Sequence, residues 1–121
     1  MPITRCNSVG FRLMLGLALL IASIAMLTPG SEQPGLFWQA DKLAHLGVFM
    51  TLAFLADAGW PDSPFNGKKF LPLLGYGAAI ELLQLTIPMR SGSLLDLVAD
   101  VLGLLLYGLL ILPLLRHWKI R

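Results

Sequence analysis

Ionisable and amide side chains recur at helical spacing in the apolar stretches of this sequence. Three of the four stretches carry such a pair three or four residues apart: Asp41 and His45, Glu81 and Gln84, Asp96 and Asp100. Residues at this spacing share one face of an α-helix, so each stretch would present one polar edge to its neighbours. Carboxylate and imidazole groups can carry out acid–base chemistry, which makes Glu81 and His45 the catalytic candidates.

The composition requires membrane-spanning helices to position these side chains. The 121-residue chain is 56% hydrophobic and 13% charged, about half the ~25% charge of an average soluble domain. This excludes a soluble enzyme, a nucleic-acid-binding domain and a disulfide scaffold. We expect an all-α membrane protein, a single domain over residues 1–121 with four transmembrane helices in an up-down bundle. The predicted helices cover about 11–28, 41–56, 70–87 and 94–115.

The first stretch has a second interpretation as a secretory signal peptide. Arg5 and Arg12 precede its apolar run, as such a peptide requires. The small-residue triplets, such as Ser23-Ile24-Ala25, lie inside the run rather than after it. This favours a retained helix, and cleavage would leave three spans with the same orientation.

The basic residues predict the orientation in the membrane. With the N-terminus inside, seven of the nine basic residues are cytoplasmic and only Lys42 and Arg90 lie outside. Positively charged connections stay in the cytoplasm, so we expect a multi-pass inner-membrane protein with both termini cytoplasmic, N-in/C-in. Asp57 and Asp62 then fall in the cytoplasmic connection.

Most of the remaining polar groups fall together in the extracytoplasmic half. Glu81 precedes Pro88 by seven residues, which places it ~10 Å along the helix and within the hydrocarbon. A carboxylate at a helix centre costs roughly 2.5–3.5 kcal/mol to insert, so such residues are functional candidates. The predicted ligand-binding residues are Asp41, Lys42, His45, Glu81, Gln84, Arg90, Asp96 and Asp100.

Simpler interpretations exist for four of these residues. Asp41 could cap its helix, Lys42 could extend to the membrane interface, and Gln84 could bond to a neighbouring helix. Arg90 could simply be solvated in a short loop. Close helix packing is predicted by two pairs of small residues spaced four apart, Ala99 with Gly103 and Gly75 with Ala79.

The order of the polar residues resembles the VanZ-like family, small membrane proteins named after a protein linked to teicoplanin resistance. The similarity covers about residues 36–108 and consists of Asp41-Lys42-x-x-His45, Glu81-Leu82-Leu83-Gln84, Arg90, Asp96, Asp100 and Gly103. The family pattern often has Asn at position 100, where Asp adds an ionisable group. The resemblance implies a role in the cell envelope, and a link to resistance follows by analogy only.

Three classes of function stay open. The first is binding of an envelope lipid headgroup or lipid-linked precursor, with phosphate contacted by Arg90 and Lys42. The second is a membrane-embedded hydrolase or transferase using the Asp/His/Glu cluster, whose side chains are also metal-ligand types. The third is a structural or accessory subunit, or a proton-coupled carrier. The chain lacks HExxH, GxSxG and P-loop motifs, which disfavours catalysis. We expect no metal or cofactor. The expected partners are membrane lipids, without nucleic acid.

Overall fold

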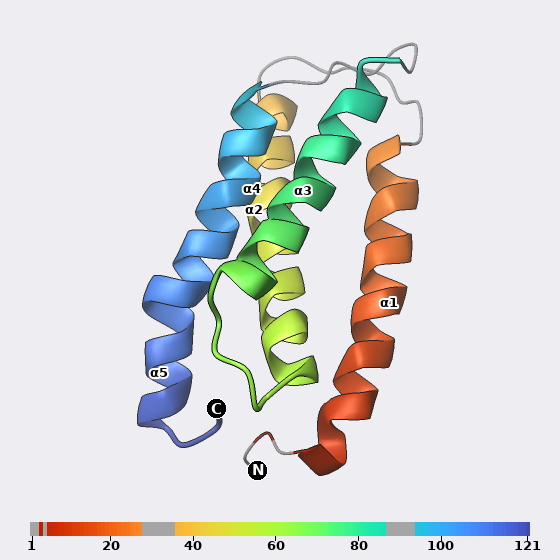
Figure 1. Ribbon diagram of the computed structural model, residues 1–121. Coiled ribbons are helices and arrows are strands. Elements are labelled where there is room, and N and C mark those ends of the chain that lie inside the picture. The colour runs from red at the N-terminus through yellow and green to blue at the C-terminus, as the bar shows by residue number, and fades with distance from the viewer. Residues whose placement is uncertain (1–2, 4, 28–35, 87–93) are drawn as a thin grey trace.

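The computed structural model describes residues 3, 5–27, 36–86 and 94–121, which form helices and no strands. The first three helices are α1 (Arg5–Leu27), α2 (Leu36–Gly59) and α3 (Gly67–Gln84). The fourth segment continues through α4 (Leu94–Leu106), a π-helical turn η1 (Tyr107–Ile111) and α5 (Leu112–His117). The helices lie side by side, and α1 begins at the end of the molecule where α5 ends (Figure 1). The predicted all-α class is confirmed.

Three segments are long and apolar enough to cross a membrane: Asn7–Leu27, Lys42–Gly59 and Leu94–His117. Helix α3 is not among these three. Its first turn carries Lys68 and Lys69, and its last turn carries Glu81 and Gln84. These residues make α3 more polar than the three candidate spans. It nevertheless packs against α1, α2 and α4.

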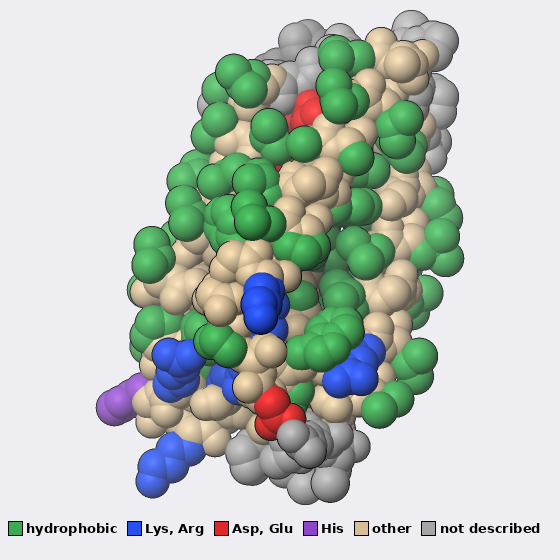
Figure 2. All heavy atoms as spheres, in the orientation of Figure 1, with side chains coloured by type: hydrophobic (Ala, Val, Ile, Leu, Met, Phe, Trp, Pro, Cys, Tyr) green, Lys and Arg blue, Asp and Glu red, His purple; other side chains and the backbone are tan. Residues whose placement is uncertain are grey.

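The outward faces of α1 and the fourth segment are apolar. Large exposed side chains line them, among them Leu13, Leu17, Ile21, Leu102, Leu105 and Leu109. On the face drawn in Figure 2, hydrophobic side chains are spread along the length of the helices, and Lys and Arg side chains gather toward the end where α1 begins. A contiguous apolar surface of this kind is suited to lipid contact.

Helices α2 and α4 make the closest approach. A Cβ added to Gly103 would lie 2.4 Å from the Leu46 carbonyl oxygen, so only glycine allows this separation. The pair Ala99 and Gly103 is buried, as predicted. The second predicted pair is wrong in its register: a Cβ on Gly75 meets nothing within 4 Å, whereas one on Gly77 would lie 3.2 Å from Phe49 Cζ.

The helix ends differ from the predicted ones at the end where α1 begins. Helix α1 starts six residues earlier than predicted, and α2 continues through Asp57 to Gly59 instead of ending at 56. Asp57 therefore lies in α2 and not in the connection. Its carboxylate forms ion pairs with Lys69 and Arg121 inside the bundle.

The fourth segment does not end at Pro113. Proline lacks an amide hydrogen and crowds the preceding turn. The chain accommodates it through the π-turn η1, in which the Leu112 amide donates to the Tyr107 carbonyl, and the helix continues to His117.

Candidate functional site

The site predicted from the sequence forms around His45, which joins α2 to α4. Its Nδ1 lies 2.9 Å from Asp100 Oδ1, and its Nε2 lies 3.9 Å from Asp96 Oδ2. Because the two aspartates are four residues apart on α4, both carboxylates face α2 and reach the same ring. A proton on Nδ1 would be donated to Asp100, and the lone pair of the neutral ring would then be on Nε2.

Lys42 forms an ion pair with Asp96 across the same interface. Lys42 lies three residues before His45, so the two side chains share one face of α2. Asp96 lies in the first turn of α4, where the helix N-terminus favours a carboxylate. The Lys42 side chain is 17% exposed against 4% for Asp96, so Lys42 marks the edge of the cluster.

Glu81 brings α3 into the site. His45, Glu81 and Asp96 each offer one potential metal-ligand atom, and these three atoms lie within 4.8 Å of one another. All three residues are buried. Metal–ligand bonds are ~2.0–2.6 Å long, so one divalent cation could bridge atoms at such separations. The arrangement resembles metal sites in a further respect, since the second nitrogen of a metal-binding histidine commonly donates to a carboxylate.

Gln84 points elsewhere. Its Nε2 donates to the Met26 carbonyl oxygen at 2.9 Å and so ties α3 to α1. The interpretation of Gln84 as a helix-to-helix hydrogen bond is confirmed. The same α1–α3 contact includes Ser23 and Tyr76, whose hydroxyl oxygens lie 2.7 Å apart.

We call Lys42, His45, Glu81, Asp96 and Asp100 the acid-rich cluster. Of the eight predicted ligand-binding residues, these five come together. The side chain of Asp41 and all of Arg90 lie outside the described residues. Among the described side chains of the cluster, three carboxylates face one lysine and one histidine. Buried carboxylates are stabilised by a bound proton, a cation or a hydrogen-bond donor.

A second buried cluster, which the sequence did not predict, lies at the opposite end of the helices. Asp57 Oδ1 accepts from Lys69 Nζ at 2.7 Å and from Arg121 Nη2 at 3.0 Å. Its Oδ2 accepts from the Tyr107 hydroxyl at 2.6 Å and from Arg121 Nε at 3.0 Å. We call Asp57, Lys69, Tyr107 and Arg121 the ion-pair cluster.

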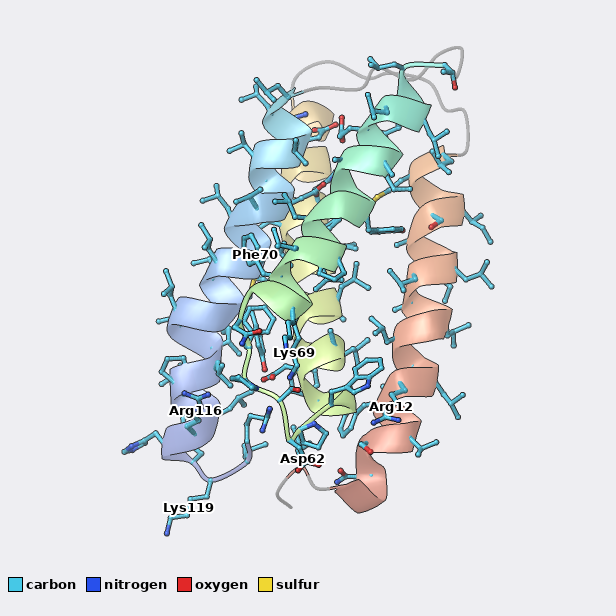
Figure 3. The ribbon with its side chains drawn as sticks, in the orientation of Figure 1. Arg12, Asp62, Lys69, Phe70, Arg116 and Lys119 are labelled. Atoms are coloured by element: carbon cyan, nitrogen blue, oxygen red, sulfur yellow. The ribbon has the colours of Figure 1, made fainter. Side chains whose placement is uncertain are left out.

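Lys69 also holds the connection between α2 and α3. Its ammonium group donates to the carbonyl oxygens of Trp60 at 2.9 Å and Ser63 at 2.7 Å. Figure 3 shows Lys69 inside the bundle, whereas Lys119 points away from it. One sequence signal was available, because Asp57 lies within the apolar run Leu55-Ala56-Asp57-Ala58. A carboxylate in such a run is expected to pair with a buried cation.

Comparisons with known proteins were made against family models, curated proteins and solved structures. No family model matches the chain. Neither the curated proteins nor the solved structures give a match. The VanZ-like resemblance therefore stays a prediction from the order of the motifs, and the function is argued from the geometry of the site.

Proposed function

We propose that this chain is a four-helix inner-membrane protein with both termini in the cytoplasm. Support comes from the basic residues, which gather at the end where α1 begins (Figure 2), as positive-inside sorting favours. The packing of α3 against three neighbours supports it as the fourth span. In this orientation the acid-rich cluster faces the extracytoplasmic side and the ion-pair cluster faces the cytoplasm.

The acid-rich cluster binds the polar headgroup of an envelope lipid or of a lipid-linked precursor. The observation that carries this proposal is the convergence of His45, Glu81 and Asp96 from three helices to within 4.8 Å in a buried position. A purely structural contact has no need of three buried carboxylates, since interhelical hydrogen bonds in membranes average only ~0.6 kcal/mol.

The charges of the cluster define which part of a headgroup it contacts. Lys42 is paired with Asp96, so it offers little to an incoming phosphate. The carboxylates of Glu81 and Asp100 instead suit hydroxyl and ammonium donors, which sugars and amines supply. Phosphate recognition is assigned to Arg90, as the sequence predicts.

The test is the lipid content of the protein extracted from membranes into polymer-bounded nanodiscs. Glu81→Gln keeps the side-chain shape and removes one charge, and Glu32→Gln makes the same change at the other glutamate of the chain. We expect Glu81→Gln to lower the retained ligand roughly tenfold, which corresponds to ~1.4 kcal/mol, and Glu32→Gln to retain it. An identical lipid profile in both variants would overturn the proposal.

The resemblance to VanZ-like proteins adds one arm to this test. If the ligand is a lipid-linked wall precursor, expression of the protein lowers susceptibility to teicoplanin, and Glu81→Gln removes the effect. Unchanged susceptibility alongside a retained headgroup lipid would separate lipid binding from resistance.

A second candidate function, a membrane-embedded hydrolase or transferase, is favoured by the orientation of His45. Its Nδ1 faces Asp100 at 2.9 Å and its Nε2 faces Asp96 at 3.9 Å. In this function Nε2 would take a proton from water or bind a divalent cation with Glu81 and Asp96. Turnover of labelled lipid phosphoesters, together with metal analysis of wild type and Glu81→Gln, distinguishes the two functions. If the wild type shows no turnover and contains no metal, lipid binding is the function that remains.

A further inference from the structure

The acid-rich cluster is built in two layers around one point. His45 from α2, Glu81 from α3 and Asp96 from α4 each bring one potential ligand atom to within 4.8 Å of the other two. In the outer layer, Asp100 contacts the ring of His45. Lys42 likewise pairs with the carboxylate of Asp96. Three convergent ligand atoms, supported by groups that contact the ligands and not the ion, are the plan of a protein metal site.

The gap between His45 and Asp96 is wider than a hydrogen bond and close to the spacing of two ligands on one ion. Nε2 of His45 and Oδ2 of Asp96 lie 3.9 Å apart, whereas a hydrogen bond between such atoms is ~2.7–3.2 Å long. Two atoms that each lie ~2.0–2.2 Å from a tetrahedral zinc ion are separated by ~3.3–3.6 Å. Small rotations of the two side chains therefore bring both atoms onto one ion.

Asp100 fixes the direction in which His45 presents its ring. Nδ1 of His45 lies 2.9 Å from Asp100 Oδ1, and both side chains are buried. With the Nδ1 proton donated to Asp100, the lone pair of the neutral ring is on Nε2, the nitrogen that faces Asp96. A metal-binding histidine commonly makes this same contact, which orients the ring and raises the basicity of the ligand nitrogen.

Two close helix contacts hold the ligands at these separations. Gly103 lets α4 approach α2, since a Cβ there would lie 2.4 Å from the carbonyl oxygen of Leu46. Gly77 does the same for α3 and α4, since a Cβ there would lie 3.0 Å from Asp100 Oδ2. The ligands are thus carried by three closely packed helices, which hold a ligand geometry more precisely than loops do.

A metal ion does not require vacant ligand atoms at this site. Carboxylates and imidazole bind metal in their deprotonated forms, so an incoming ion displaces protons and hydrogen-bond donors from them. The contacts that the cluster already makes therefore set the affinity of the site for the ion and do not exclude binding.

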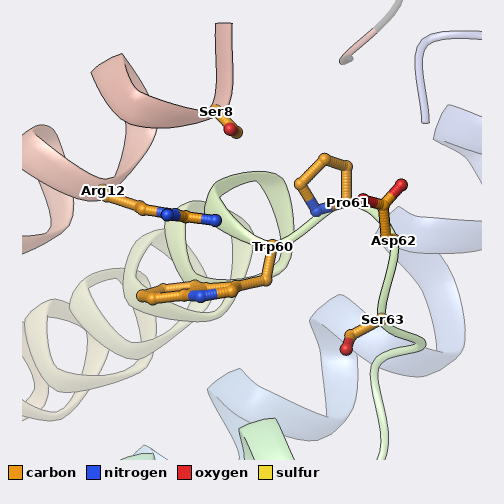
Figure 4. Close-up of a pocket in the computed structure, with 6 residues that line it drawn as sticks. All are labelled: Ser8, Arg12, Trp60, Pro61, Asp62 and Ser63. Carbon is orange, nitrogen blue, oxygen red and sulfur yellow. The ribbon is translucent and has the colours of Figure 1, made fainter. Parts of the chain in front are cut away.

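The opposite end of the molecule offers a carboxylate in a different setting. A cavity of about 390 Å³ lies there, lined by Ser8, Arg12, Trp60, Pro61, Asp62 and Ser63 (Figure 4). The Arg12 guanidinium lies over the Trp60 ring, 4.8 Å from its centre, and its positive charge disfavours a metal ion beside Asp62. Asp62 is also exposed. Substitution of Asp62 therefore serves as a control for adventitious metal binding to a surface carboxylate.

We propose that His45, Glu81 and Asp96 bind one Zn²⁺ ion. Imidazole together with carboxylates suits zinc, whereas Mg²⁺ and Ca²⁺ are bound by oxygen ligands. No sequence motif predicts this site, because its three ligands come from three helices. Three protein ligands leave a fourth position for water, or for an oxygen of the bound headgroup that replaces this water. The headgroup oxygen rests on the proposed lipid-binding function, whereas the ion is held by the protein alone.

The test is the zinc affinity of the full chain in nanodiscs, stripped with a chelator and titrated with Zn²⁺ against a chromophoric competitor. We expect one zinc ion per chain, which Mg²⁺ and Ca²⁺ do not displace. His45→Gln and Glu81→Gln should abolish competition with the chromophore. The controls are Asp62→Asn and His117→Gln, which removes the other histidine of the chain, exposed in α5. Both controls should keep the wild-type affinity.

Asp100→Asn tests the positioning role of Asp100. This variant should keep one zinc ion per chain and weaken its binding by ~10–100-fold, as loss of a group that orients a ligand does. It should also shift the visible absorption of Co²⁺ bound in place of zinc, a signal that a merely structural role would not change. Wild-type affinity with an unshifted Co²⁺ spectrum would contradict the role of Asp100.

The wild type alone can overturn the proposal, whether or not the variants fold. Stripped wild type that takes up no zinc would do so, and so would zinc binding that His45→Gln retains. Loss of zinc in Asp62→Asn or His117→Gln equal to that in His45→Gln would also overturn it, because the binding would then be adventitious. Lipid retained by the same samples separates the two proposals. Zinc without retained lipid supports the metal site and contradicts the lipid-binding function, and retained lipid without zinc does the reverse.

Discussion

At the end of the bundle where α1 begins, Asp57 is fully buried and its two oxygens accept from Lys69, Tyr107 and Arg121. At the other end, Glu81, Asp96 and Asp100 share Lys42 and His45 as their described basic neighbours. Both groups of residues are buried among the same helices. They differ in the balance of their charges, with two cations for one carboxylate in the first and three carboxylates for one lysine and one histidine in the second.

This difference indicates two purposes for buried charge. A carboxylate whose oxygens are all occupied can fix the helices that supply its partners, and it has no capacity left for a ligand. A cluster with surplus carboxylates is less favourable for folding, and a bound group can relieve the surplus. The ion-pair cluster thus holds the α2–α3 connection and the chain after α5, while binding is the role that we propose for the acid-rich cluster.

The largest expected effect belongs to Asp57→Asn. The change leaves Lys69 and Arg121 without the carboxylate that neutralises them, at side-chain exposures of 7% and 13%. Removing one partner of a buried pair costs about 3–5 kcal/mol. Equilibrium unfolding in detergent or bicelles measures it. The control is Asp62→Asn, an exposed carboxylate five residues later, where we expect a change within ~0.5 kcal/mol. Equal losses of stability in Asp57→Asn and Asp62→Asn would show that the buried ion pairs of Asp57 do not stabilise the fold.

A smaller effect is expected from Gly103→Ala, which separates α2 from α4 between the two clusters. The new Cβ would lie 2.4 Å from the Leu46 carbonyl oxygen, and such overpacking costs about 1–3 kcal/mol. Because Lys42 and His45 reach Asp96 and Asp100 across this interface, ligand retention should fall together with stability. Gly75→Ala, where the added Cβ meets nothing within 4 Å, should be neutral or slightly stabilising. The measurement is the unfolding curve of Gly103→Ala compared with that of Gly75→Ala. A Gly103→Ala variant as stable as the wild type would contradict the close approach of α2 and α4.

The residues that the sequence predicted are those whose relation is local. Asp96 and Asp100 share a face because they are four apart on one helix. The apolar stretches predicted four spans, and three segments of the described chain are long and apolar enough to cross a membrane. The partners of Asp57 lie 12, 50 and 64 residues away, so no spacing rule joins them. The partner of Gln84 is a backbone carbonyl, which leaves no trace in the sequence. Likewise, the spacing of small residues does not define the rotation of α3 about its axis. That rotation places Gly77, and not Gly75, against the neighbouring helices.

The role of Glu81 in the acid-rich cluster is tested most directly by the free energy of unfolding. If the acid-rich cluster is retained for binding, Glu81→Gln removes one of three like charges and leaves stability within about 1 kcal/mol of wild type, or raises it. Asp57→Asn, measured in the same lipid, should lose at least about 3 kcal/mol. A loss in Glu81→Gln as large as that in Asp57→Asn would contradict the account, because it would make both clusters structural.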